Sequence, residues 1–112
     1  MAETVNATSR ELPHGESEVE YVGLRTTPSA KVKPPRLVEA PVAMECKVRQ
    51  IIPVGSGAIA ANLVIGEVLV MHIDEAVLDG NGRVDPRKLK TVARLGQDYW
   101  CHTSDLFEQT RP

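Results

Sequence analysis

The side chains best suited to chemistry in this 112-residue sequence are three histidines and two cysteines. His72 lies near the end of a long apolar stretch, just before the acidic pair Asp74-Glu75. A histidine at such a strand end either completes the edge of a core or offers a ring nitrogen to a ligand at the mouth of a barrel. Both interpretations of His72 stay open at this point, with the core-edge role as the default.

The remaining candidates for catalysis or metal binding have simpler explanations. Cys101 and His102 are adjacent, and neighbours on a strand point to opposite faces, which argues against a nucleophilic pair. The stretch "DGNGRVD" begins like a calcium loop, but Val84 and Lys90 occupy the positions that need glycine and glutamate. The histidines lack metal-ligand spacing and there is no C-x-x-C pair. We therefore expect no metal site.

The elements that position these residues begin with a half-buried strand over residues 42–48. Apolar and charged side chains alternate there with a period of two, which predicts one apolar face and one face in water. The apolar face comprises Val42, Met44, Cys46 and Val48, and the wet face comprises Glu45, Lys47 and Arg49. Pro53 and the Gly55-Ser56-Gly57 stretch then predict a turn.

A second strand is expected over residues 61–73, and it ends next to His72. Its residues are apolar on both sides, which is typical of a strand that is covered on both faces. Gly66 marks the place where a bulge or a bend would curve the sheet toward a barrel. Such a strand needs neighbours that this chain barely supplies.

Short helices are expected on either side of these strands. Ser17 and Glu20 form a capping-box pattern for a helix of about two turns. Asp85-Pro86 opens a second helix, which Gly96 ends. In the segment that follows, an extended chain would place Tyr99 and Cys101 on one side. Residues 1–16 are polar and are expected to form a flexible terminus.

The connector of residues 25–41 carries four prolines, which favour extended geometry. Its basic residues form either an anion-binding strip or a solvated connector, and the second is favoured. They are Arg25, Lys31, Lys33 and Arg36.

Composition excludes several classes of partner. The formal net charge is −2, so no overall field attracts nucleic acid. The longest apolar stretch is interrupted by polar residues, and we expect no membrane span. Cys46 and Cys101, without a secretory signal, indicate a reducing, cytoplasmic location and two buried thiols.

Three separated segments carry a family resemblance. They are "PSAKVKPPRLVEAPVAMECKV", "LVIGEVLVMHIDEAVLDGNGRVDPRKLKTVARLG" and "DYWCHTSDLFEQTRP". Together they closely resemble the carboxy-terminal half of the flavin reductase-like family of FMN-binding proteins, of the flavoredoxin type. On this resemblance, residues 17–112 correspond to the second half of a split-barrel domain.

The resemblance implies a mainly β fold: a partial FMN-binding split barrel with short peripheral helices. It also implies a homodimer that holds FMN non-covalently and exchanges electrons with NAD(P)H or with a partner protein. Among the family's cofactor contacts, the histidine after the Gly-Glu-Val strand corresponds to His72, which on this resemblance donates a hydrogen bond to the flavin. An aromatic residue near the carboxy terminus covers the flavin, and Tyr99 is favoured over Phe107 for that role.

Two functional hypotheses follow from this resemblance. Family members are about twice as long, so the chain is expected to be a truncated frame or one part of a split gene. The first hypothesis is an FMN-binding protein that transfers electrons through the flavin. The alternative is a catalytically silent fragment that acts as an interaction or dimerisation piece, with itself or with a complementary chain.

Overall fold

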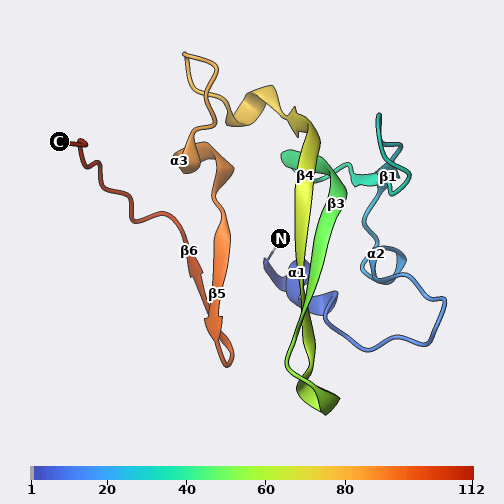
Figure 1. Ribbon diagram of the computed structural model, residues 1–112. Helices are drawn as coiled ribbons and strands as arrows, with labels where there is room; N and C mark the ends of the chain where they lie inside the picture. Colours follow the sequence, from blue (N-terminus) through green and yellow to red (C-terminus); the bar gives the residue numbers. More distant parts are fainter. Residues whose placement is uncertain (1) are drawn as a thin grey trace. The chain divides into compact units, whose positions relative to one another are not determined.

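The computed structural model describes residues 2–112, whose contacts divide them into two compact units. One unit is Arg25–His72, and the other joins the residues up to Leu24 with Ile73–Pro112. Strands dominate the secondary structure and the helices are short (Figure 1). The predicted mainly β class is confirmed.

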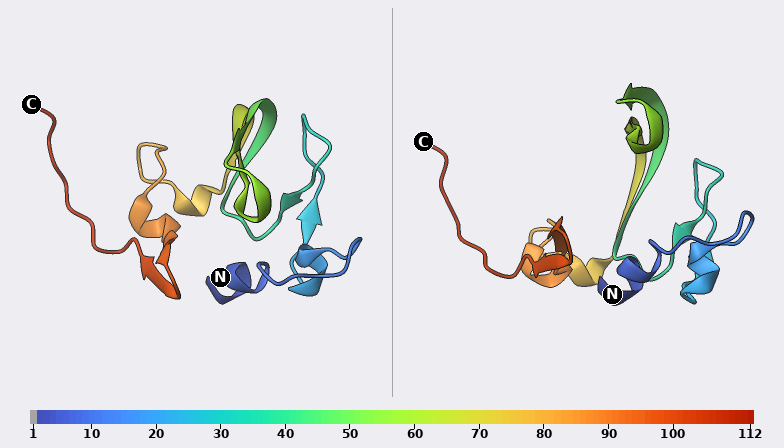
Figure 2. Two further views of the ribbon diagram at one scale, coloured as in Figure 1. Left: turned by 60° about the horizontal axis from the view of Figure 1, so that its bottom comes forward. Right: turned by 90° about the horizontal axis from the view of Figure 1, so that it is seen from below.

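A long hairpin forms most of the first unit. Strand β3, Val42–Val54, and strand β4, Ala61–Ile73, pair in one two-stranded sheet. They run in opposite directions and remain side by side in every view (Figures 1 and 2). The turn between them contains η1, Gly57–Ile59, and both Gly55 and Gly57 have positive φ, at 76° and 75°. Glycine adopts this backbone without the Cβ clash of other residues. The two predicted strands and the glycine turn are therefore confirmed, but β3 continues beyond the predicted residue 48 and includes Pro53, which was expected in the turn.

Gly66 allows the two strands of this hairpin to approach closely. A Cβ at this position would lie 3.2 Å from the Cβ of Cys46. Strand β4 continues through the glycine. The absence of a side chain permits the close approach to Cys46, while the bulge or bend expected at Gly66 stays a prediction.

Replacing Gly66 with valine is expected to destabilise the protein by about 1–3 kcal/mol, because the added side chain collides with Cys46. Chemical denaturation would measure the loss. Gly80→Val is the matched control, since a Cβ at Gly80 meets nothing within 4 Å. Equal stability losses in both variants would show that the close approach of the strands at Gly66 does not contribute to the free energy of unfolding.

The proline-rich connector forms a small sheet of its own within the first unit. Strands β1, Thr26–Thr27, and β2, Arg36–Leu37, pair antiparallel, with Thr26 opposite Leu37 and Thr27 opposite Arg36. Glu39 accepts hydrogen bonds from the backbone N–H of Arg25 at 3.2 Å and from its Nε at 2.9 Å. The connector is therefore a folded loop that returns on itself.

The second unit contains the remaining helices. They are α1, Ala2–Ala7; α2, Glu18–Tyr21; η2, Glu75–Val77; and α3, Pro86–Leu89. The sequence predicted α2 and the start of α3, although Ser17 makes no side-chain cap hydrogen bond. Helix α1 lies within the terminus whose flexibility remains a prediction. Val77 is 6% exposed and is the one apolar side chain that is buried among those whose burial the structure describes.

The helix expected up to Gly96 is wrong beyond Leu89. Lys90 has a left-handed backbone with φ of 50°, which stops α3 after one turn. Strand β5, Val92–Gly96, follows and pairs antiparallel with β6, Tyr99–His102. Val92 has a β-branched side chain that favours a strand. Pairing with β6 provides hydrogen-bond partners for the backbone N–H and C=O groups of β5, which would otherwise bond within a helix.

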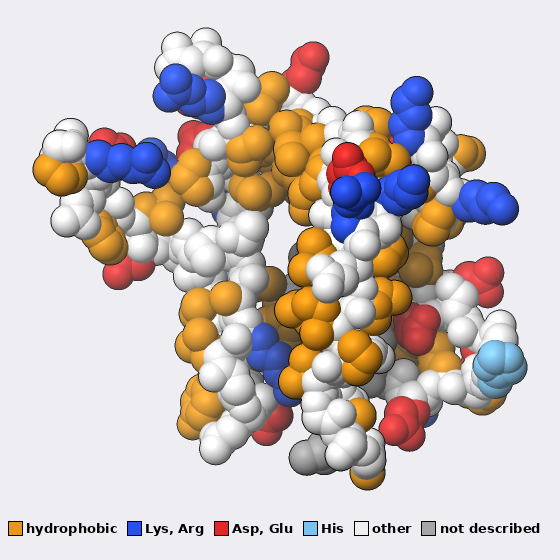
Figure 3. Space-filling model, in the orientation of Figure 1, with side chains coloured by type: hydrophobic (Ala, Val, Ile, Leu, Met, Phe, Trp, Pro, Cys, Tyr) orange, Lys and Arg blue, Asp and Glu red, His pale blue; other side chains and the backbone are white. Residues whose placement is uncertain are grey.

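Apolar side chains are exposed along both strands of the hairpin, contrary to the predicted burial. Met44 and Val48 are 57% and 55% exposed, and Cys46 is exposed as well. Both faces of β4 carry exposed apolar residues, including Leu63, Val64, Ile65, Val68 and Leu69. Figure 3 shows this apolar surface over the hairpin. The sequence pattern predicted covered faces, and within the first unit these apolar side chains are not covered.

Within residues 2–112, no helix has the length and apolar character needed to cross a membrane.

Candidate functional site

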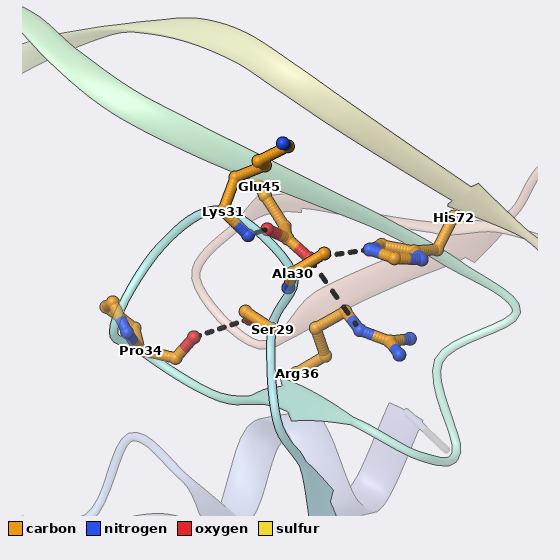
Figure 4. A network of polar contacts seen from close by, with 7 residues as sticks. All are labelled: Ser29, Ala30, Lys31, Pro34, Arg36, Glu45 and His72. Carbon is orange, nitrogen blue, oxygen red and sulfur yellow. Dashed lines mark hydrogen bonds and ion pairs between the residues drawn. The ribbon is translucent and has the colours of Figure 1, made fainter.

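A buried carboxylate organises the most polar site of the first unit. Glu45 is 2% exposed, the lowest value among the described residues, and it lies on β3. Its Oε1 accepts from the backbone N–H of Ala30 at 2.8 Å, and its Oε2 accepts from that of Lys31 at 2.6 Å. His72 Nε2 lies 2.6 Å from Oε1. We call Glu45, His72, Arg36 and these two N–H groups the Glu45 cluster (Figure 4).

Three segments of the chain meet at this cluster. The hairpin brings His72, the second-last residue of β4, beside Glu45 near the start of β3. The connector loop supplies the two N–H groups and is closed by a 2.6 Å hydrogen bond from Ser29 Oγ to the carbonyl of Pro34. Prolines at 28, 34 and 35 restrict this loop, which lowers the entropy lost when it is ordered. Local sequence and long-range pairing therefore fix the cluster together.

The surroundings of Glu45 favour its ionised form. The N–H of Ala30 is the main cause that lowers the pKa of Glu45 to about 2; desolvation opposes it, and His72 and the N–H of Lys31 add to the lowering. Arg36 Nε lies 4.0 Å from Oε1. That Nε is buried and has no hydrogen-bond partner among residues 2–112. The buried carboxylate is thus balanced by several donors rather than by one ion pair.

The stability of the protein should fall in acid because Glu45 becomes protonated. The pKa of Glu45 falls from 4.5 to about 2 on folding, so the unfolded chain binds more protons between these values. The contribution of Glu45 to stability is then complete above pH 4.5 and is lost as the pH falls toward 2. Unfolding measured from pH 2 to 6 should show a steeper pH dependence for the native protein than for Glu45→Gln. Parallel curves would contradict this role.

His72 is held at one ring nitrogen and is partly open to solvent. Its side chain is 28% exposed, whereas that of Glu45 is 1% exposed. Among residues 2–112 the ring has no hydrogen-bond partner besides Glu45. The imidazole is therefore oriented by a buried group and still accessible at its other side.

A hollow of about 390 Å³ lies against the same cluster. Arg36 and Glu45 line it, together with Ser29, Pro34, Met44 and Cys46. This volume is within the range of small-molecule sites, which combine apolar walls with a few polar groups. The hollow thus offers a mixed apolar and cationic wall, and His72 adjoins it through Glu45 rather than lining it.

Comparison with known proteins decides the family. Residues 1–88 match the flavin reductase like domain. The chain belongs to this flavin reductase-like family. A Halalkalibacterium halodurans protein is 38% identical to it, over 98% of this chain and 53% of that protein. The chain therefore spans about half the length of the curated relatives it matches.

Solved structures show the fold of the family. Nitrilotriacetate monooxygenase component B from Bacillus cereus aligns with a TM-score of 0.87 and 31% identity, covering 96% of this chain and 54% of that one. A Shewanella frigidimarina protein, described as a flavin reductase with a split barrel domain, aligns with a TM-score of 0.81 and 24% identity, over 98% of this chain and 55% of that one. The predicted split-barrel class is confirmed, and the described strands form three two-stranded sheets of it.

Membership of the flavin reductase-like family implies a flavin cofactor, and the Glu45 cluster fits one edge of it. A flavin ring presents carbonyl oxygens and one N–H along its pyrimidine edge. Arg36 supplies hydrogen-bond donors, including the buried Nε without a partner, and His72 supplies an accessible ring nitrogen. Exposed apolar side chains of the hairpin suit the flat ring. The donor set is therefore compatible with a flavin.

The two aromatic residues predicted to contact the flavin belong to the other unit. Tyr99 begins β6 and is 69% exposed, and Phe107 is 85% exposed in the segment after β6. His72 is the predicted residue that lies in the Glu45 cluster. The meeting of these three residues at one flavin remains a prediction.

Sequence analysis of this flavin reductase-like chain missed Glu45 and Arg36. Strand alternation assigned Glu45 to the wet face, and the proline-rich composition made Arg36 part of a solvated connector. Glu45 lies instead under the connector loop, which folds over that face of β3. Arg36 is part of that connector, and its Nε lies 4.0 Å from Glu45 Oε1. One signal in the sequence could have revealed Glu45. It lies on the strand that pairs with the strand carrying His72, and a carboxylate and an imidazole can form a hydrogen-bonded pair.

Proposed function

We propose that this chain binds FMN non-covalently and takes part in electron transfer between NAD(P)H, or a partner protein, and the bound flavin. When bound, the flavin supplies the chemistry of accepting and releasing electrons. The protein's own groups hold the ring and set its surroundings. Family membership and the shape of the Glu45 cluster support this proposal.

Each predicted residue has a separate task in this proposal. His72 hydrogen-bonds the polar edge of the flavin from its accessible ring nitrogen. Tyr99, or else Phe107, packs on the ring and limits its contact with water. Arg36 provides positive charge beside the hollow, where it stabilises the electron-rich reduced flavin.

The observation that carries the proposal is the orientation of His72. Glu45, itself almost fully buried, holds one ring nitrogen while the side chain remains 28% exposed. The exposed part of the ring is free to meet a ligand while Glu45 holds the other part. The free thiols of Cys46 and Cys101 agree with the reducing cytoplasm that we propose as its location.

The experiment is anaerobic reduction of FMN in the presence of the protein. Adding NADH or NADPH should bleach the oxidised flavin absorbance faster with the protein than without it. Equal rates with and without protein would contradict a role in electron transfer from these donors.

Tyr99→Leu is expected to recover much of the flavin fluorescence that the native protein quenches, because an aromatic ring in contact with flavin is an efficient quencher. Phe107→Leu is the matched variant, and it should have the smaller effect. Recovery with Phe107→Leu alone would transfer the covering role to Phe107. No recovery with either variant would remove both residues from the site.

The exposed hairpin favours a second candidate function, that of an interaction piece. An apolar surface of this extent on both strands normally contacts another protein. We propose a second copy of this chain as the partner, with a complementary chain as the alternative outcome. Sedimentation of the purified protein should show a dimer, whereas a stable monomer would contradict the second copy.

A further inference from the structure

We propose that Glu45 is a positioning residue that fixes the tautomer of His72, so that Nε2 carries the proton and Nδ1 faces the ligand. This inference deepens the proposed FMN site and rests on that site for its functional meaning. The tautomer itself is a property of the protein without flavin.

The geometry around Glu45 places a proton on His72 Nε2, in the neutral ring and in the charged ring alike. An ionised carboxylate only accepts hydrogen bonds, so the nitrogen 2.6 Å from its Oε1 must be the one with the proton. The N–H groups of Ala30 and Lys31 are fixed donors to the same carboxylate. No other donor or acceptor in the cluster competes for Nε2, and Nε2–H donates to Glu45.

This tautomer determines what Nδ1 can do. In the neutral ring Nδ1 carries a lone pair, so it accepts a hydrogen bond from a ligand N–H or O–H. It donates only when the imidazole is protonated. The sequence-based expectation that His72 donates to the flavin therefore applies to the charged ring. The neutral ring recognises a donor group instead, such as the flavin ring N–H or a ribityl hydroxyl.

The orientation of His72 is rigid because Glu45 is itself immobilised. Two backbone N–H groups hold its oxygens, and the loop that supplies them is closed by Ser29 and Pro34. Within this unit the charged group that contacts the imidazole ring is Glu45 from β3. Arg36 from β2 lies beside the other side of that carboxylate and acts on the ring only through it. A rigid second layer of this kind fixes a functional histidine more precisely than solvent does.

Nitrogen NMR of the histidine rings tests the proposal in the native protein without flavin. In the neutral ring, His72 Nε2 should give a protonated, pyrrole-type signal and Nδ1 a pyridine-type signal. His72→Gln assigns the signals by removing them. A proton on Nδ1, or an even mixture of the two tautomers, would overturn the proposal.

Glu45→Gln then tests the cause. A glutamine amide has one acceptor oxygen and one donor nitrogen, so it cannot accept from Ala30, Lys31 and His72 together. The expected result is averaged His72 signals and FMN binding that is about 10-fold weaker. Glu39→Gln is the matched control, because Glu39 binds Arg25 in the same unit and does not touch His72. Native-like His72 signals in Glu45→Gln would overturn the proposal.

Failure of this inference can be told apart from failure of the proposed function. If FMN does not bind while His72 shows the expected tautomer, the FMN site is wrong and the positioning role stands. If FMN binds while His72 shows the other tautomer, the positioning role is wrong. Should Glu45→Gln fail to fold, the NMR result on the native protein still decides.

Discussion

Replacing His72 with alanine is expected to weaken FMN binding about 10- to 100-fold, because the site loses a hydrogen bond in a partly desolvated position. The substitution also leaves buried Glu45 with one donor fewer. FMN titration followed by flavin fluorescence would measure the change. The same titration of Glu45→Gln should show a smaller loss of FMN affinity, since the imidazole ring of His72 is still present in that variant.

His14→Ala is the matched control for this prediction. His14 is exposed, belongs to the other unit, and should leave FMN affinity unchanged. Unfolding curves of the His72 variant separate a lost contact from a lost fold. Unchanged affinity in a folded His72→Ala protein would remove His72 from the flavin site.

Replacing Val68 with lysine should shift the protein from dimer to monomer, with association weakened at least about 10-fold. Val68 is 47% exposed on β4, within the apolar surface of the hairpin. Burying an ammonium group in an apolar interface costs several times the thermal energy, and the valine contact is lost as well. Sedimentation at several protein concentrations would measure the shift.

Asn62→Lys provides the control for charge alone. Asn62 is an exposed polar residue on the same strand, so this variant adds the same charge without removing an apolar contact. It should stay dimeric. Equal dissociation in both variants would point to charge repulsion, and no dissociation in either would exclude this surface of the hairpin from the interface.

The hairpin was predictable because local pattern and turn chemistry agree there. Alternation from Val42 to Val48, the apolar run after Ala61, and the glycines between them all favour the same two strands. The start of α3 was predictable for a similar reason, since Asp85 caps the helix and Pro86 opens it. Such features depend on neighbours in sequence.

Burial was not predictable because it depends on neighbours in space. Alternation places Glu45 and Met44 on opposite faces of β3, and the apolar character of Met44 predicted that its face is the covered one, whereas Glu45 is buried and Met44 is exposed. The connector loop covers Glu45, and its N–H groups make burial of the charge favourable. Strand β5 was missed because Leu89, Val92 and Leu95 also fit a helical spacing, whereas pairing with β6 is a long-range contact.

The decisive experiment is calorimetric titration of FMN into the native protein. Saturable binding is expected, together with a change in the His72 Nδ1 signal in NMR spectra while the Nε2 signal keeps its protonated character. Absence of binding heat and of any change in the flavin spectrum, at FMN concentrations well above those that saturate typical cofactor sites, would contradict the proposed FMN site.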